Sequence, residues 1–227
     1  MNAGTMYPEK KNNKLDIGCR NIEDTFIANV AGHYVMARVL LSSRSSDHPK
    51  IQFVSLTSVL FKCLRTIPST KEGWYRQFKK GLPFFTDGFL SYGRSKAANI
   101  VLSNYLNTQD GAVAISVNPG NVRTGLIDRM PIYIYSPLWA LARLRPMHQS
   151  MEECAETVIA CTMQSNQSPN CLFELKNGKY VYTPLSPSFS NPNVLTSFSR
   201  FCDDITSQWP TDSIPIPNSD RSKRATA

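Results

Sequence analysis

The sequence lacks the features that mark several classes of protein. It has no run of 18 or more apolar residues, the length that a transmembrane helix needs. Its first residues lack the apolar stretch of a secretory signal peptide. Its six cysteines form no C-x-x-C pair, and its three histidines have no metal-ligand spacing. We therefore expect free thiols, no metal site, and a cytoplasmic protein or one at the periphery of an intracellular membrane.

Acidic residues are also scarce: 17 Asp and Glu stand against 25 Lys and Arg, a net charge of +8. The basic residues are scattered and not interleaved with aromatic residues, so solvated surface charge is favoured over a nucleic-acid partner. Hydrophobic residues make up 41% of the chain, which is enough for a packed core. We expect one folded unit over residues 1–210 and a disordered basic tail over 211–227.

Hydrophobic periodicity predicts helices alternating with short buried strands, an α/β pattern typical of a parallel sheet with helices on both faces. The predicted helices cover 21–41, 92–106 and 150–163, and the predicted strands cover 51–56, 112–117, 171–175 and 180–183. Asn21 is the expected N-cap of the first helix, and Gly32 within it suggests close backbone packing. Residues 62–88 are expected to be an irregular insertion with a helical piece, and proline and serine dominate after residue 184.

Tyr92 and Lys96 are the most informative pair, because residues i and i+4 share one face of a helix. A tyrosine proton normally leaves near pH 10, so acid–base work at neutral pH needs a shift of roughly three units. A cation at ~4 Å supplies about that much at an effective dielectric of ~20. Such pairs also occur by chance on amphipathic helices, and taken alone that reading is favoured. Hydroxyl residues at 57–58 and the segment 118–124 follow the flanking strands, where parallel sheets bind ligands.

In order and separation, several short segments resemble the short-chain dehydrogenase/reductase family. They are Asn2-Ala3-Gly4, Asn29 within "ANVAGHY", Thr57-Ser58, "YGRSK" at 92–96 and "NPGNVRTG" at 118–125. Residues 137–162 and "NGKYV" are similar to the branch of retinol dehydrogenases and WW-domain-containing oxidoreductases. The resemblance implies part of a Rossmann-like, doubly wound sheet and an NAD(P)-dependent oxidoreductase acting on an apolar carbonyl or alcohol.

The resemblance also implies roles for individual residues. Tyr92 is implied as the general acid/base, Lys96 as the group that lowers its pKa and holds the nicotinamide ribose, and Asn29 as the anchor of a relay water. The implied cofactor, NAD or NADP, would contact Asn2, Ala3, Gly4, Tyr92, Lys96, Pro119, Gly120, Val122 and Thr124.

The serine that would orient the substrate carbonyl has two alignments. The Leu-Thr-Ser ending favours Ser58. If the strand is instead counted from Lys50, Leu56 takes the place of the catalytic hydroxyl residue, and Ser55 is the fallback candidate. Ser55 can equally be explained as a buried strand serine that bonds to the backbone.

Residues 131–147 are implied as a substrate lid whose aromatic and leucine side chains suit a retinoid, steroid or lipid-like substrate. Arginines around this segment permit shallow membrane contact, although a lid helix packed on its own domain explains the composition equally well. Self-association stays open.

No glycine-rich phosphate-binding turn, G-x-G-x-x-G or G-x-x-x-G-x-G, occurs in the sequence. In the family this turn precedes the Asn-Ala-Gly segment, so we expect the chain to be a truncated form with an incomplete cofactor site. The strand at 51–56 would then become an apolar sheet edge. The alternative function is a catalytically inactive remnant that acts as a binding or regulatory module.

Overall fold

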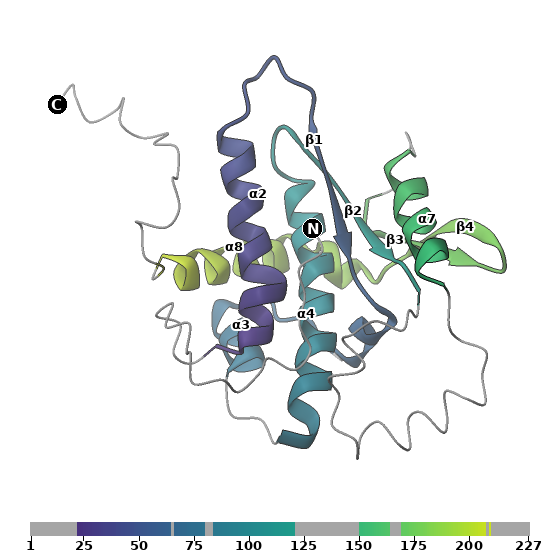
Figure 1. Ribbon diagram of the computed structural model, residues 1–227. Coiled ribbons are helices and arrows are strands. Elements are labelled where there is room, and N and C mark those ends of the chain that lie inside the picture. Colours follow the sequence, from purple (N-terminus) through teal and green to yellow (C-terminus); the bar gives the residue numbers. More distant parts are fainter. Residues whose placement is uncertain are drawn as a thin grey trace.

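The computed structural model describes residues 22–64, 66–79, 84–120, 150–163, 169–207 and 209. Its four strands are β1 (Ile51–Leu56), β2 (Ala112–Asn118), β3 (Cys171–Lys176) and β4 (Lys179–Pro184). They form one sheet in the order β1-β2-β3-β4, in which β1, β2 and β3 run parallel and β4 is antiparallel to β3 (Figure 1). The predicted α/β class with a mostly parallel open sheet is confirmed, and β1 is the edge strand among the described strands.

The two faces of the sheet carry different helices because side chains alternate along each strand. Phe53, Ala114 and Leu172 join the large core formed with α2 (Gly32–Ser42) and α4 (Phe84–Leu106). The opposite face is covered by α7 (Met151–Thr162), which contributes Cys161 to a smaller cluster with Ile115, Val117 and Phe173. Figure 1 shows α2 and α4 side by side, with α7 beside β3 and β4.

The first predicted helix contains a π-helical turn. It runs as α1 (Asp24–Phe26), the π-helix η1 (Ile27–Ala31) and α2 without a break. Glu23, not the predicted Asn21, is the N-cap. Gly32 does not mark a close approach of another segment, because a Cβ there would meet only the Ile27 carbonyl of its own helix, at 3.6 Å. The wider π-turn brings that carbonyl there.

The second predicted helix begins earlier than expected, since α4 starts at Phe84 and not at Tyr92. Tyr92 therefore lies two turns inside the helix, and the expectation that it stands near a helix start is wrong. The insertion before it holds a 3₁₀ turn, η2 (Val59–Cys63), and α3 (Lys71–Phe78), which matches the predicted helical piece.

The predicted ends of α7 and the hairpin are confirmed. Ser150 and Glu153 form a reciprocal capping box at the start of α7. Asn177 and Gly178 both have positive φ, 50° and 73°, the conformation of the two-residue turn that joins β3 to β4.

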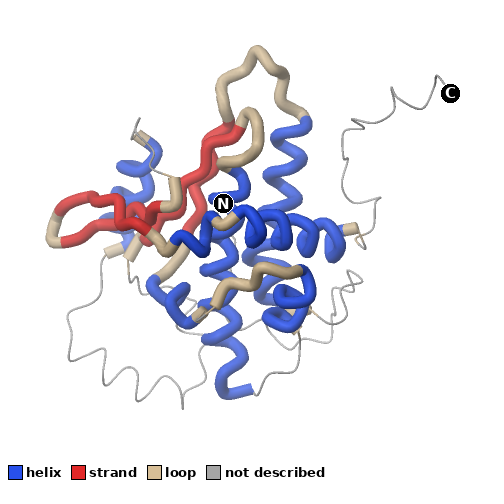
Figure 2. Tube along the Cα trace, turned by 180° about the vertical axis from the view of Figure 1, so that it is seen from behind, coloured by secondary structure: helices blue, strands red, loops and turns tan. Residues whose placement is uncertain are grey.

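The sequence analysis missed α8 (Pro192–Thr206), which follows a short 3₁₀ turn, η3 (Pro187–Ser190). Figure 2, seen from behind, shows α8 lying across α2 and α4. Its buried face holds Phe198, Phe201 and Ile205, and Phe201 packs against Phe26 with ring centres 5.2 Å apart. No helix in the described ranges is apolar over a length that would cross a bilayer.

Candidate functional site

Tyr92 and Lys96 lie together where α4 passes the carboxyl end of β1. The Lys96 ammonium donates a hydrogen bond to the Leu56 carbonyl at 2.9 Å and lies 5.3 Å from the centre of the Tyr92 ring. The Thr57 hydroxyl donates to the Lys96 carbonyl at 3.0 Å. These contacts attach the turn of α4 that carries Lys96 to the end of β1.

The electrostatics of the pair differ from the expectation. Burial raises the pKa of Tyr92 to about 12, and burial lowers the pKa of Lys96 to about 8. The predicted lowering of the Tyr92 pKa by Lys96 is therefore absent in this structure. The physical reason is that both side chains are desolvated, which disfavours the phenolate and the ammonium alike, while the ammonium lies against the ring and bonds to Leu56.

Asn29 sits in the π-helical turn and is completely buried. Its side-chain amide donates to the Ser95 hydroxyl at 2.9 Å, and that hydroxyl donates to the Tyr92 carbonyl at 2.7 Å. Single π-turns inside helices are frequent at functional sites. The structure thus brings the predicted Asn29 to the same turn of α4 as Tyr92 and Lys96.

The two serine alternatives occupy different positions. Ser58 follows β1 and caps η2, where its hydroxyl accepts a hydrogen bond from the Leu60 amide at 3.4 Å. Ser55 lies within β1 and is 1% exposed, with no hydrogen-bond partner for its hydroxyl among the described residues. Ser58 is thus the serine beyond the strand end, and Ser55 points into the core face that also contains Phe53.

The turn after β2 contains the predicted residues Pro119 and Gly120 and is held by Glu174 and Cys154, which the sequence analysis did not single out. Gly120 has a φ of 94°, a conformation that suits glycine, and its amide donates to the Asn118 side chain at 3.3 Å. The Asn118 amide donates to Glu174 at 3.2 Å, and the Cys154 thiol donates to the Pro119 carbonyl at 2.6 Å. These partners are 56 and 35 residues away in sequence, so only the fold reveals them.

The remaining predicted site residues fall outside the described ranges. They are Asn2, Ala3, Gly4, Val122 and Thr124, together with the predicted lid at 131–147. The tail at 211–227 is outside as well. In the part of the chain that is described, no group of three or more His, Cys, Asp or Glu residues is placed to hold a metal ion.

His33 is a further buried polar residue near this site. It lies on α2, 6% exposed, one helical turn after Asn29. Burial, and to a smaller extent the charge of Lys96, lower the pKa of His33 to about 4. The histidine is therefore neutral at physiological pH.

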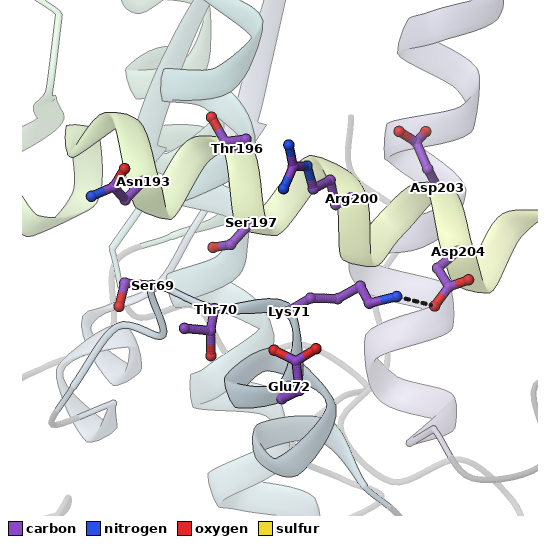
Figure 3. A pocket seen from close by; sticks show the side chains of 10 residues that line it. All are labelled: Ser69, Thr70, Lys71, Glu72, Asn193, Thr196, Ser197, Arg200, Asp203 and Asp204. Atoms are coloured by element: carbon purple, nitrogen blue, oxygen red, sulfur yellow. Dashed lines mark hydrogen bonds and ion pairs between the residues drawn. The ribbon is translucent and has the colours of Figure 1, made fainter.

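A separate groove of about 1070 Å³ lies between the start of α3 and one face of α8 (Figure 3). Polar residues line it, among them Thr70, Arg200 and the ion pair of Lys71 with Asp204 at 3.1 Å. None of the predicted site residues contributes to its lining. The groove is therefore not the site that Tyr92 and Lys96 form at the end of β1.

No protein-family model matches the chain. The chain is similar to the WW domain-containing oxidoreductase of Gallus gallus, with 31% identity over 154 residues. The match covers 62% of this chain and 33% of that protein, so the chain spans about a third of the length of the relative. This similarity supports a distant relationship to an oxidoreductase, in agreement with the mostly parallel sheet.

Proposed function

We propose that the chain is an NAD(P)-dependent oxidoreductase of the short-chain dehydrogenase/reductase type, acting on an apolar carbonyl or alcohol. The observation that carries the proposal is the placement of Tyr92 beside Lys96 at the carboxyl end of β1, with Asn29 bonded to the same turn of α4. Parallel sheets bind ligands at this edge. The similarity to an oxidoreductase supports the same assignment.

The acid–base role of Tyr92 is favoured in the direction of carbonyl reduction. A phenol with a pKa of about 12 is protonated at neutral pH, so Tyr92 can donate its proton to a carbonyl oxygen. Lys96, with a pKa of about 8, is mostly charged at neutral pH, and in this proposal its ammonium would hold the nicotinamide ribose. Ser58 would orient the carbonyl, and Asn29 would position a water that returns the proton.

The described residues fit the nicotinamide end of NAD or NADP, which supplies or accepts the hydride when bound. Lys96 is a buried cation with three N–H donors, a suitable partner for ribose hydroxyls. The turn at Pro119 and Gly120 follows the neighbouring strand β2, and a glycine, which has no side chain, would let a cofactor approach the backbone closely there. Lys96 and this turn would hold the cofactor.

The substrate class rests on composition. The predicted lid at 131–147 is rich in aromatic and leucine residues, which suit a retinoid, steroid or lipid-like molecule. Peripheral membrane contact through the same segment would give access to such substrates.

The test is turnover of retinal with saturating NADPH or NADH by the whole chain and by Tyr92→Phe. The proposal expects measurable reduction, lowered by about 100-fold or more in Tyr92→Phe, because general acid catalysis contributes at least that much. Turnover that is unaffected by Tyr92→Phe contradicts the mechanism.

A non-catalytic binding or regulatory module is the second candidate function. The observation that favours it is the lack of a glycine-rich phosphate-binding turn in the 227 residues. This candidate expects no turnover from the wild-type chain at any concentration of cofactor.

A further inference from the structure

Glu23 is a buried carboxylate that the proposed mechanism does not use. It is 5% exposed and occupies the N-cap position of α1, yet its side chain makes no capping hydrogen bond there. Its backbone amide donates to the Phe78 carbonyl at 2.9 Å, so the end of α3 holds the residue in place. The carboxylate itself reaches another element of the fold.

Glu23 contacts two residues of α4 that flank Tyr92 in the sequence. The Ser91 hydroxyl donates to Glu23 Oε2, and the Arg94 guanidinium lies 3.8 Å from Glu23 Oε1. Arg94 is largely buried and also donates to the Gln77 carbonyl at 3.3 Å. A largely buried ion pair is costly to form, so it is weak evidence for stability alone.

The contacts of Glu23 and Asn29 act on the same two turns of α4. Glu23 binds Ser91 and Arg94, and Asn29 binds Ser95, so the N-cap of α1 and the π-turn contact three residues of the stretch 91–95 of α4. Tyr92 lies among these residues in sequence and on the adjacent side of the helix. The rotation of α4 about its axis therefore determines whether Tyr92 faces the end of β1.

We propose that Glu23 is a positioning residue for Tyr92, acting through Ser91 and Arg94. The carboxylate holds the rotation of α4 and thereby keeps the phenol buried beside Lys96. The catalytic consequence rests on the proposed function, whereas the placement of Tyr92 is measurable without turnover.

The test reads the ionisation of Tyr92 in the whole chain. Protein labelled with 3-fluorotyrosine is titrated with pH and followed by fluorine NMR, and the Tyr92 signal is the one missing from Tyr92→Phe. In Glu23→Gln the ion pair is lost, water reaches the phenol, and the Tyr92 midpoint falls by about one unit toward that of a solvated tyrosine. Arg94→Gln should lower the Tyr92 midpoint by the same amount. The double variant should lower it no further, because each single substitution already removes the same ion pair between Glu23 and Arg94.

The control is Glu72→Gln, which neutralises an exposed carboxylate on α3 and should leave the midpoint unchanged. A purely structural role would lower the melting temperature of Glu23→Gln without moving the Tyr92 midpoint, and that result overturns the proposal. If Glu23→Gln does not fold, Arg94→Gln decides by the same criterion. Absence of turnover in every variant would contradict the proposed function and leave this readout intact.

Discussion

The ammonium of Lys96 lies 5.3 Å from the centre of the Tyr92 ring and donates a hydrogen bond to the Leu56 carbonyl. The lysine thus contacts both the tyrosine and the end of strand β1. Because the ammonium is buried, its charge is disfavoured, and this sets the first prediction.

Lys96 should titrate well below the ordinary value of a lysine side chain. Burial lowers its pKa to about 8, so in reductively methylated, carbon-13-labelled protein one lysine signal should move with a midpoint near that value. The signal should be missing from Lys96→Met. Lys50, an exposed lysine just before β1, provides the comparison through Lys50→Met, which should leave the low midpoint in place. A Lys96 midpoint near that of a solvated lysine would contradict the burial argument.

Stability should fall in acid because of His33. Its pKa in the folded chain is about 4, below the ordinary value of 6.5, so the unfolded chain binds the proton more readily. The contribution is complete above pH 6.5 and is lost as pH falls from 6.5 through 4, by about 3 kcal/mol in total. Urea unfolding of His33→Gln should show a shallower loss over this range.

The matched control for His33 is His48→Gln, since His48 is exposed in the turn before β1. Its pH profile should follow the wild type. A wild-type loss that persists unchanged in His33→Gln would assign the acid sensitivity to other groups.

Helix α8 should be essential for the stability of the large core. Phe201 is completely buried and packs against Phe26 and Tyr75, with ring centres 5.2 and 4.9 Å away. Phe201→Ala should lower the free energy of unfolding by about 3–5 kcal/mol. Met163→Ala, at a residue that is 80% exposed, should change it by less than about 0.5 kcal/mol. Equal effects of the two substitutions in urea unfolding would show that α8 is not docked.

Cofactor binding by the chain should be weak. The sequence has no glycine-rich turn of the kind that holds a pyrophosphate at a helix N-terminus, so Lys96 and the turn at Gly120 have only the nicotinamide side to bind. Calorimetric titration with NADPH and NADH should give no binding in the micromolar range. A micromolar dissociation constant for either cofactor would refute this expectation.

Local patterns predicted those elements whose signals are contained within a few residues. The buried strand at 51–56 follows from its short apolar run, and the start of α7 follows from the capping box of Ser150 and Glu153. Helix α8 was missed although Asn191 and Pro192 provide start signals, because serine and proline dominate the surrounding composition.

The site shows the same division. The i, i+4 spacing predicted that Tyr92 and Lys96 share a face of one helix, and the structure places them together. The direction of the Tyr92 pKa was not predictable, because it depends on burial by elements distant in sequence. The contacts of Glu23 with Ser91 and of Glu174 with Asn118 join residues 68 and 56 positions apart, beyond any local pattern.

The π-helical turn at Ile27–Ala31 absorbs one residue more than an α-helical turn would hold. Its residues turn the chain about as far around the axis as an α-helical stretch one residue shorter, so the two flanking pieces keep the angular phase of one helix. Removing one residue from this turn would restore an ordinary α-helix and leave Phe26 in the core and Glu23 against α4. The insertion therefore alters the local backbone around Asn29 without disturbing the packing of either end.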